Sequence, residues 1–313
     1  MNFRQYKWTY QLFNFFKRDQ LKHNIPLYKK YGVNKKYYSS VSSEDFKGID
    51  APLNIYDVED SAVEMPKNAQ FSALSESLQK SLLTWSKDGY VILPKFFSEE
   101  KVDTCNEEIT KLIRSKHINF KYSNKLMFAF HQSQFIRSMG EDDRLLKVLN
   151  VLLGKEVDLF QSINFLEGSQ QRTHSDSIHM TTFPYGNLIA AWVALEDIEE
   201  GAGPLHYYPG SHKLPYVMNR DYGNVGSRFK LGDKKYSDYE DHIEGLIQDE
   251  KLDKKQFLAR KGDVLIWHAN LLHGGEPVLS EGSTRKSMVF HYYTRDSICF
   301  HEITQRPTLK ESR

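Results

Sequence analysis

The chain has 313 residues, 40% hydrophobic and 27% charged, which is typical of a soluble globular protein with an ample core. Its formal net charge of +1 does not favour nucleic acid as a partner, and no stretch approaches the roughly 20 apolar residues that span a bilayer. Two cysteines are too few for a disulfide framework and fit a reducing compartment, so we expect a cytoplasmic protein.

The first 40 residues are aromatic and basic, with nine lysines and arginines against the single acidic Asp19. One interpretation is an amphipathic segment that touches an anionic membrane surface or a partner protein. The other, which we favour, is a helix that packs its aromatic side chains on the main domain and leaves its lysines in solvent. Residues 40–70 show no clear periodicity and are interpreted as a linker or a draped loop, so residues 1–70 form an N-terminal extension.

Helices come next along the chain. Leucines spaced for one helical face predict a helix over 73–89. The run 90–97 reads as a strand, and a second helix, capped by Ser98, continues to about residue 114. A third helix is expected over 142–154, because Gly154 closes an apolar repeat.

Strand-like runs separated by turn residues dominate the second half, namely 156–168, 187–198, 203–211, 256–268 and 285–294. Helices first and strands later argue against a parallel, doubly wound sheet. We therefore predict an α+β or mainly β fold, an antiparallel sandwich or barrel with helices packed on one side. The polar stretch 216–255 reads as a long insertion, and we expect it to order over the active site only when substrate is bound.

The stretch "RTHSDSIHM" places His174 and Asp176 two positions apart. On one strand, residues i and i+2 point to the same face, so both could reach one ion inside a barrel. An imidazole and a carboxylate supply two thirds of the facial triad that holds non-heme Fe(II). A third ligand must come from a distant strand, and "GDVLIWHANLLHGGEP" offers His268 and His273.

The run "RKSMVFHY" places Arg285 and Ser287 on one strand face. An inward guanidinium must meet an anion, and it binds a carboxylate in bidentate fashion. A dicarboxylate such as 2-oxoglutarate could chelate iron with its keto-acid end and reach Arg285 with its far carboxylate. Alone, Arg285 would be read as an exposed charge at the start of a strand.

The motifs, in chain order, are "DGYVILPKFFSEEKVD", "LLGKEV", "HSD", "GAGPLHYYPGSH", "KGDVLIWHANLLHGGEP" and "STRKS". They resemble the phytanoyl-CoA dioxygenase family of Fe(II)- and 2-oxoglutarate-dependent oxygenases, which includes the ectoine hydroxylases. The resemblance covers about residues 75–295 and implies a double-stranded β-helix, a jelly-roll or cupin-like barrel. We accordingly assign residues 71–300 to the oxygenase domain and 301–313 to a C-terminal tail.

The resemblance also implies roles for individual residues. His174, Asp176 and His273 would be the iron ligands; His273 is preferred because Arg285 follows it by twelve positions, close to the family spacing. Arg285, Asn164 and Ser287 would bind 2-oxoglutarate. The family pattern often has an Asn-x-Ser/Thr between the distal histidine and the arginine, and the stretch "EPVLSEGST" has no asparagine. That departure leaves the loop geometry open.

The implied activity is hydroxylation of an unidentified small molecule of a lipid, acyl or secondary-metabolite class, with O2 consumed and succinate and CO2 released. The expected pocket lining is Met180, Tyr185, Trp192, Trp267 and Asn270, although the two tryptophans could equally be barrel core. A non-catalytic binding module on the same barrel is one alternative. Desaturation, cyclisation or epimerisation at the same iron site is the other, and the oligomeric state is not predicted.

Overall fold

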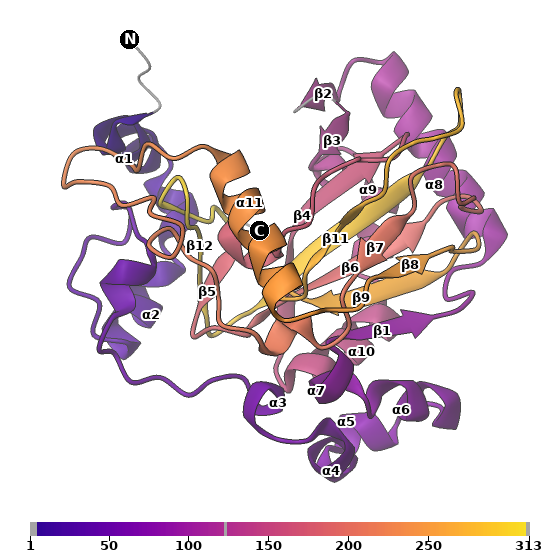
Figure 1. Ribbon diagram of the computed structural model, residues 1–313, viewed down its shortest axis with the longest axis horizontal. Coiled ribbons are helices and arrows are strands. Elements are labelled where there is room, and N and C mark those ends of the chain that lie inside the picture. Colours follow the sequence, from indigo (N-terminus) through magenta and orange to yellow (C-terminus); the bar gives the residue numbers. More distant parts are fainter. Residues whose placement is uncertain (1–4, 122–123, 311–313) are drawn as a thin grey trace.

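The computed structural model describes residues 5–121 and 124–310, and its strands form three antiparallel sheets (Figure 1). The largest has the order β1 (Tyr90–Leu93), β9 (Val264–His268), β6 (Leu188–Ala194), β11 (Ser287–Thr294), β4 (Val157–Phe165), β3 (Lys125–Met127) and β2 (Phe120–Lys121). The second has the order β10 (His273–Gly275), β7 (Leu205–Tyr207) and β8 (Lys255–Phe257). The third has the order β13 (Arg306–Pro307), β12 (Ile298–His301) and β5 (Thr181–Phe183). The predicted antiparallel jelly-roll class is confirmed.

The helices are α1 (Lys7–Phe16), α2 (Asn24–Lys30), α3 (Ile55–Val58), α4 (Ser61–Glu64), α5 (Ala69–Ser72), α6 (Glu76–Leu82), α7 (Trp85–Asp88), α8 (Glu99–Arg114), α9 (Gln134–Gly140), α10 (Asp143–Leu153) and α11 (Tyr236–Asp249). Short 3-10 helices are η2 (Arg18–Leu21), η3 (Ser43–Phe46), η4 (Met65–Lys67), η5 (Ala129–His131), η6 (Asp176–Ile178) and η7 (Ser211–Lys213). No helix in the described ranges is long and apolar enough to cross a membrane.

Helices α8, α9 and α10 cover one face of the large sheet and bury their apolar stripes against β6, β9 and β11. The Ser98 hydroxyl caps α8 by accepting a hydrogen bond from Lys101 N (3.3 Å), and Gly154 ends α10 in the left-handed region (φ 65°). The helix expected over 73–89 is instead two, α6 and α7. The Ser61 hydroxyl donates to Leu83 O (2.6 Å), which ties the break between them to the N-terminal segment.

The opposite face of the large sheet turns toward the two smaller sheets and lines the barrel interior. Along β11, the even offsets from Arg285 reach Ser287, Val289 and His291, which share this inner face, whereas Met288 and Phe290 belong to the helix-covered core. Side chains from β4, β6 and β9 join the inner face in the same alternating way. This alternation determines which residues can reach the site.

The N-terminal extension is folded onto the barrel rather than free. Residues of α2 and the chain after it, including Tyr28, Tyr31 and Phe46, pack on Phe183 and Phe300 of the third sheet. The favoured packing interpretation is therefore right for this part and wrong for α1, whose large apolar side chains are mostly exposed. Residues 40–70 are a draped segment with short helices, and residues 1–4 of the predicted basic segment lie outside the described ranges.

The polar insertion 216–255 contains an amphipathic helix, which its composition concealed. In α11, Tyr239 and Ile243 are buried and pack with Ile178 and Tyr208 of the barrel. Helix α11 therefore buries apolar surface on the barrel, although the segment is polar in composition. The expected C-terminal tail is also partly folded: Arg306–Pro307 pairs with β12, and residues 311–313 lie outside the described ranges.

Candidate active site

Three buried side chains from two distant stretches of the chain converge inside the barrel. The ligand atoms of His174, Asp176 and His273 all lie within 4.8 Å of one another. The two imidazole ring centres are 4.6 Å apart, and His273 Nε2 lies 3.8 Å from Asp176 Oδ1. Two imidazole nitrogens and a carboxylate oxygen are the donor set of a facial triad for non-heme iron, so the residues present fit this metal.

The backbone holds the two histidines together. His174 and His273 form an isolated antiparallel bridge in which each amide donates to the other's carbonyl (2.9 Å in both directions). Asp176 does not share a strand with His174 as expected, because it begins η6. The intervening Ser175 is extended (φ −108°, ψ 150°), and this keeps both ligands on one side as the i, i+2 argument requires.

The other candidate, His268, is not in the triad. Its Nε2 lies 3.2 Å from Asp57 Oδ1, a carboxylate supplied by the N-terminal extension. Its Nδ1 accepts a hydrogen bond from Asn270 N (3.1 Å). His268 thus joins the extension to the barrel.

Hydrogen bonds fix the tautomers of the two ligand histidines. His174 Nδ1 lies 2.9 Å from Arg172 O and His273 Nδ1 lies 2.9 Å from Leu271 O, so each Nδ1 carries the proton and donates it. Each Nε2 therefore presents a lone pair to the triad, which is the form that binds a metal. The Gln171 side-chain amide lies 3.2 Å from His174 Nε2, and this contact must break when His174 Nε2 binds a metal. Burial lowers the pKa of both imidazoles and keeps them neutral.

Two further side chains orient the carboxylate of Asp176. Trp267 Nε1 donates to Asp176 Oδ2 (2.8 Å), and His291 Nε2 lies 3.5 Å from the same oxygen. These contacts engage Oδ2 and leave Oδ1 facing His273. Burial opposes ionisation of the Asp176 carboxyl, whereas the hydrogen bond from Trp267 and the contact with His291 favour the carboxylate form, and the pKa of this carboxyl lies below its usual range. Asp176 is thus ready to bind a cation.

Arg285 is a buried cation in the same cavity, only 2% exposed. Within the described ranges no carboxylate pairs with it, its Nε has no hydrogen-bond partner, and its guanidinium lies 5.5 Å from the ring centre of Phe165 and 5.8 Å from that of Trp192. Burial lowers its pKa to about 10, which leaves it charged at neutral pH. A buried, unpaired guanidinium requires an anion. Ser287 shares its face, and its buried Oγ also lacks a partner.

Asn164 does not fit the role given to it. Strand pairing sets Asn164 opposite Met288 of β11 and Leu126 of β3, and both belong to the helix-covered core. Its neighbours Ile163 and Phe165 line the cavity instead. A contact between Asn164 and 2-oxoglutarate is therefore not supported, because a shift of one position moves a strand side chain to the other face.

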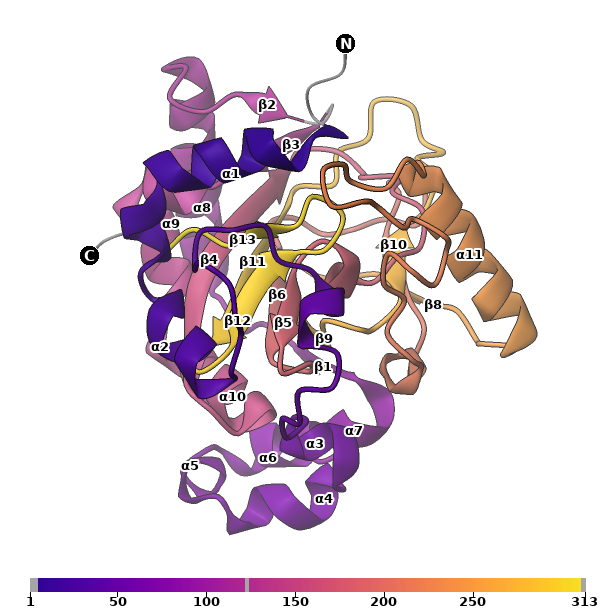
Figure 2. The same ribbon diagram turned by 90° about the vertical axis from the view of Figure 1, so that its left-hand side faces the viewer.

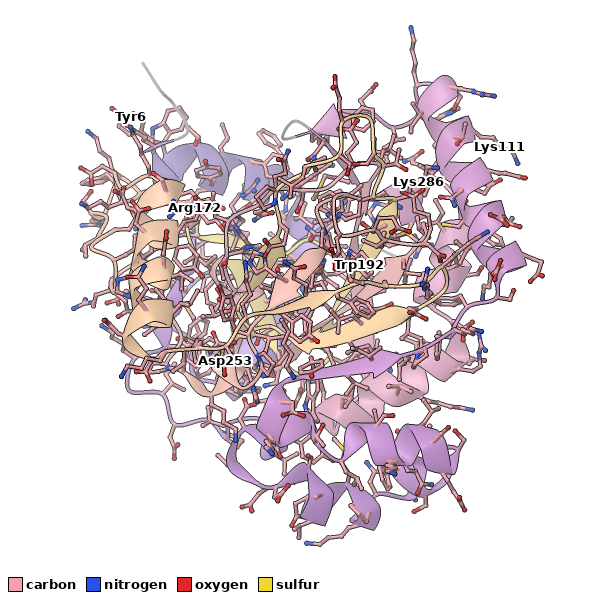
Figure 3. The ribbon with its side chains drawn as sticks, turned by 45° about the vertical axis from the view of Figure 1, so that its right-hand side comes forward. Tyr6, Lys111, Arg172, Trp192, Asp253 and Lys286 are labelled. Carbon is pink, nitrogen blue, oxygen red and sulfur yellow. The ribbon has the colours of Figure 1, made fainter. Side chains whose placement is uncertain are left out.

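Two of the expected pocket residues serve the surrounding loops instead. The Asn270 amide donates to His212 O (3.1 Å) and Leu214 O (2.8 Å), which fixes the loop after β7. Tyr185 stacks on Tyr216 and does not line the cavity. Met180, Trp192 and Trp267 do line the cavity, and their contact with a substrate stays a prediction. In Figure 3 Trp192 lies in the interior between the sheets.

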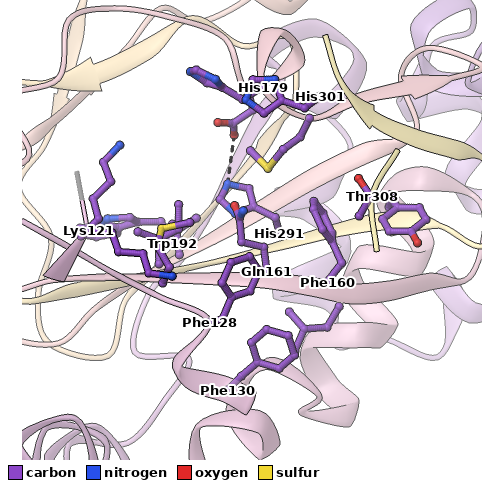
Figure 4. Close-up of a pocket in the computed structure, with 18 of the residues that line it drawn as sticks. Lys121, Phe128, Phe130, Phe160, Gln161, His179, Trp192, His291, His301 and Thr308 are labelled. Carbon is purple, nitrogen blue, oxygen red and sulfur yellow. Dashed lines mark ion pairs between the residues drawn. The ribbon is translucent and has the colours of Figure 1, made fainter. Parts of the chain in front are cut away.

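The cavity has a volume of about 1530 Å³ and contains the triad, and Figure 4 shows part of its lining. Its apolar lining includes Phe128, Phe130, Leu159, Phe160 and Ile163. Its lining also includes charged side chains, namely Lys121, Lys125, Arg137, Glu141, Asp158, Glu240, Arg306 and Lys310. The sequence interpretation missed His291, whose ion pair is dashed in Figure 4, although its even offset from Arg285 on one strand was a usable signal.

Helix α11 is joined to the metal-binding segment. The Tyr239 hydroxyl accepts a hydrogen bond from Ser175 N (3.1 Å), and the Tyr236 hydroxyl lies 3.0 Å from His179 Nε2 in the cavity wall. Arg172, which lies beside α11 in Figure 3, pairs with Glu244 (2.7 Å) and with two other acids of the helix. The insertion thus supports the active site rather than lying apart from it.

The fold is a jelly-roll barrel with a His-Asp-His triad inside it. The same cavity contains Arg285, a buried guanidinium that can bind a carboxylate. Together these features define the class of iron- and 2-oxoglutarate-dependent oxygenases. The comparisons with known proteins agree with this class. Residues 85–287 match the family model described as Phytanoyl-CoA dioxygenase (PhyH), and the chain belongs to this family. The predicted family, enzyme class and dependence on iron and 2-oxoglutarate are confirmed at this level.

Three curated relatives illustrate the range of the family. The Phytanoyl-CoA dioxygenase domain-containing protein 1 homolog of Dictyostelium discoideum is 26% identical, over 69% of this chain and 66% of its own length. The ectoine dioxygenase of Halomonas elongata is 25% identical, with coverages of 69% and 70%. The peroxisomal phytanoyl-CoA dioxygenase of Bos taurus is 27% identical, with coverages of 73% and 71%. The chain thus spans about two thirds of the length of these relatives.

Solved structures show the same fold at lower identity. The carbocyclase SnoK from nogalamycin biosynthesis has a TM-score of 0.58 and 18% identity, over 73% of this chain and 87% of that chain. The epimerase SnoN from the same biosynthesis has a TM-score of 0.57 and 20% identity, with coverages of 73% and 86%. EctD from S. alaskensis, solved with 2-oxoglutarate and 5-hydroxyectoine, has a TM-score of 0.56 and 20% identity, with coverages of 76% and 81%.

Proposed function

We propose that the protein is a dioxygenase that hydroxylates a small molecule with a large apolar body, using Fe(II) held by His174, Asp176 and His273. The observation that carries the proposal is Arg285, a buried guanidinium without an acidic partner in the described ranges, in the cavity that contains the triad. A protein that had lost the activity would have little reason to keep a buried charge at the cost of its desolvation.

In the reaction, O2 and 2-oxoglutarate are consumed, one oxygen atom enters a C–H bond of the substrate, and succinate and CO2 leave. Bound iron supplies the redox chemistry for this exchange. Arg285, with Ser287 beside it, binds the distal carboxylate of 2-oxoglutarate and so fixes the direction in which the co-substrate lies. Trp267 and His291 hold Asp176 in one rotamer, and the apolar walls keep water from the reacting atoms.

The cavity supports a substrate of the lipid or acyl class. Its volume of about 1530 Å³ exceeds the roughly 300–1,000 Å³ of common ligand pockets, so it has room for 2-oxoglutarate and a large second molecule. Phe128, Phe130 and Phe160 provide an apolar surface, and Lys121 and Lys125 provide cations that suit an anionic group. A substrate with an apolar body and an anionic end satisfies both features.

Variants of Arg285 test the proposal. Arg285→Ala should raise the 2-oxoglutarate concentration for half-maximal succinate formation about 30-fold, because a charge-assisted contact in a buried site is lost. Arg285→Lys should recover part of the loss. Lys286→Ala is the matched control, since Lys286 is 40% exposed and pairs with Glu196 outside the cavity. Affinity can also be read without turnover from the visible absorption that 2-oxoglutarate gives on chelating Fe(II) anaerobically. Equal affinity in all three variants would remove Arg285 from the site.

Product analysis distinguishes hydroxylation from the other outcomes of the same iron site. Hydroxylation adds one oxygen atom to the substrate, whereas desaturation or cyclisation removes two hydrogen atoms and epimerisation leaves the mass unchanged. A binding module without activity would form no succinate at any substrate concentration. Cytoplasmic localisation also stays a prediction; Cys105 and Cys299 are both buried free thiols, which fits a reducing compartment.

A further inference from the structure

Helix α1 exposes the side that a helix of a globular protein normally buries. Its three most exposed apolar residues follow an i, i+4, i+8 pattern and form one stripe, namely Trp8 (53% exposed), Leu12 (51%) and Phe16 (73%), and Phe13 (46%) and Phe15 (42%) are exposed as well. The one buried residue of the helix is polar: Asn14 donates from Nδ2 to Tyr38 O (3.1 Å). The helix is thus attached through Asn14 and through a ring contact between Phe15 and Tyr38, while Trp8, Leu12 and Phe16 face solvent.

The surroundings of the stripe are basic and extend its apolar surface. Residues 5–40 carry eight lysines and arginines against Asp19, which is itself paired with Lys22 (2.7 Å). The loop before α11 adjoins the start of the helix, because Lys7 N donates to Phe229 O (3.0 Å). Phe229 is 70% exposed and lies in sequence between Arg228 and Lys230. Large apolar side chains therefore stand among positive charges on both segments.

Helix α1 contributes to the wall of the active-site cavity. Phe13, Asn14 and Gln20 line the same cavity that contains the triad. In Figure 2 α1 lies across the face of the molecule that is turned toward the viewer. A surface that binds the exposed side of α1 would therefore lie close to this cavity.

We propose that α1 is an interfacial helix that docks the protein on an anionic lipid bilayer. Aromatic and leucine side chains on one stripe, flanked by lysine and arginine, are the chemistry of helices that lie in the headgroup region of a membrane. A second copy of the chain is the less suitable occupant, since it would bring two basic segments face to face. Docking brings the cavity close to the bilayer surface, within reach of amphiphilic molecules. The docking is independent of the proposed oxygenation, since vesicle binding requires neither iron nor 2-oxoglutarate.

Vesicle co-sedimentation of the full chain tests the proposal. Vesicles with a third of their phosphatidylcholine replaced by phosphatidylglycerol should bind the protein, and pure phosphatidylcholine vesicles should bind it at least tenfold more weakly. The double variant Trp8→Ser, Phe16→Ser should lose at least tenfold in affinity, because it withdraws two large side chains from the interface. The double variant Val63→Ser, Leu279→Ser is the matched control, since it removes two exposed apolar residues (57% and 80%) outside the N-terminal helix and should bind as the parent does.

The outcomes separate docking from its competitors. All four α1 and control positions are exposed, so far-UV circular dichroism and the melting temperature should be unchanged in both variants. The charge variant Lys17→Glu, Arg18→Glu should weaken binding to anionic vesicles by at least tenfold. No vesicle binding by the parent chain, or equal binding by the parent and the α1 variant, would overturn the proposal. A parent dimer that the α1 variant converts to monomer, without vesicle binding, would show that a second copy covers the stripe.

Discussion

The hydroxyl of Tyr239 provides a test of whether α11 supports the metal site. It accepts a hydrogen bond from Ser175 N at 3.1 Å and lies 3.2 Å from Ser175 Oγ. Ser175 stands between the ligands His174 and Asp176, and both Ser175 and Tyr239 are buried. Tyr239→Phe keeps the ring in its cluster and removes only the acceptor, which leaves the Ser175 amide buried without a partner.

An unsatisfied buried donor costs about 1–3 kcal/mol. If the hydroxyl served folding alone, this cost would appear only as a lower melting temperature. If it also holds the ligand segment in place, part of the cost falls on metal binding. A share of about 1 kcal/mol corresponds to a roughly fivefold weaker affinity for Fe(II). We expect both effects in Tyr239→Phe, a melting temperature lower by a few degrees and an Fe(II) affinity lower by about fivefold.

The assay is an anaerobic Fe(II) titration in the presence of 2-oxoglutarate, paired with thermal unfolding of the metal-free protein. Tyr222→Phe is the control, because Tyr222 lies in the same cluster and its hydroxyl donates to Asn219 Oδ1 (2.9 Å), away from the triad. It should lose stability and keep its iron affinity. If both variants lose stability equally and neither loses iron affinity, then α11 is only a structural helix and this reasoning fails.

Three further predictions concern the ligands, pH and the insertion. His273→Ala should abolish tight Fe(II) binding, whereas His268→Ala should retain it and lower the melting temperature, because His268 pairs with Asp57. Burial lowers the pKa of His212 to about 3, so the unfolded chain binds the proton at a higher pH than the folded protein does. The free energy of unfolding should therefore fall as pH drops from about 6.5 toward 3, by up to ~1.4 kcal/mol per pH unit. The denaturant midpoint of His212→Gln should depend less on pH over this range. Trypsin should cut the largely exposed stretch 225–235 in the metal-free protein. If this stretch closes as a lid, iron, 2-oxoglutarate and substrate together should slow the cleavage. Equal cleavage rates in the two states would show that it is a fixed surface loop.

The parts of the fold that could be predicted are those with strong local signals. The capped helix α8, the glycine-ended α10 and the long strands β4, β6 and β11 all carry such signals in their own sequence. The short strands β5, β12 and β13 have two to four residues each and no usable periodicity, so only their partners define them. The single helix expected over 73–89 failed for a comparable reason, because the contact between Ser61 and Leu83 comes from a distant segment.

The site was more predictable than the fold around it, because its chemistry constrains residue type and order. Spacing and donor type single out His174 and Asp176, whereas the choice of His273 over His268 and the role of Arg285 depend on the family resemblance. Asn164 could not be placed, since its face depends on the register between β3, β4 and β11, and one position decides between cavity and core.

In helix α1 and in the insertion, composition alone misjudges which helix packs on the barrel, and it does so in opposite directions. The insertion is polar in composition, yet a few apolar residues at helical spacing, Tyr239 and Ile243 among them, are enough to bury one side of α11. Helix α1 looked apolar enough to pack, yet its apolar stripe faces solvent and Asn14 faces the protein. In both segments periodicity correctly indicates an amphipathic helix, but only the neighbouring structure determines which side is covered. An exposed apolar stripe is destabilising unless something outside the chain covers it, and this is why α1, and not the more polar insertion, is the segment to test for a membrane surface.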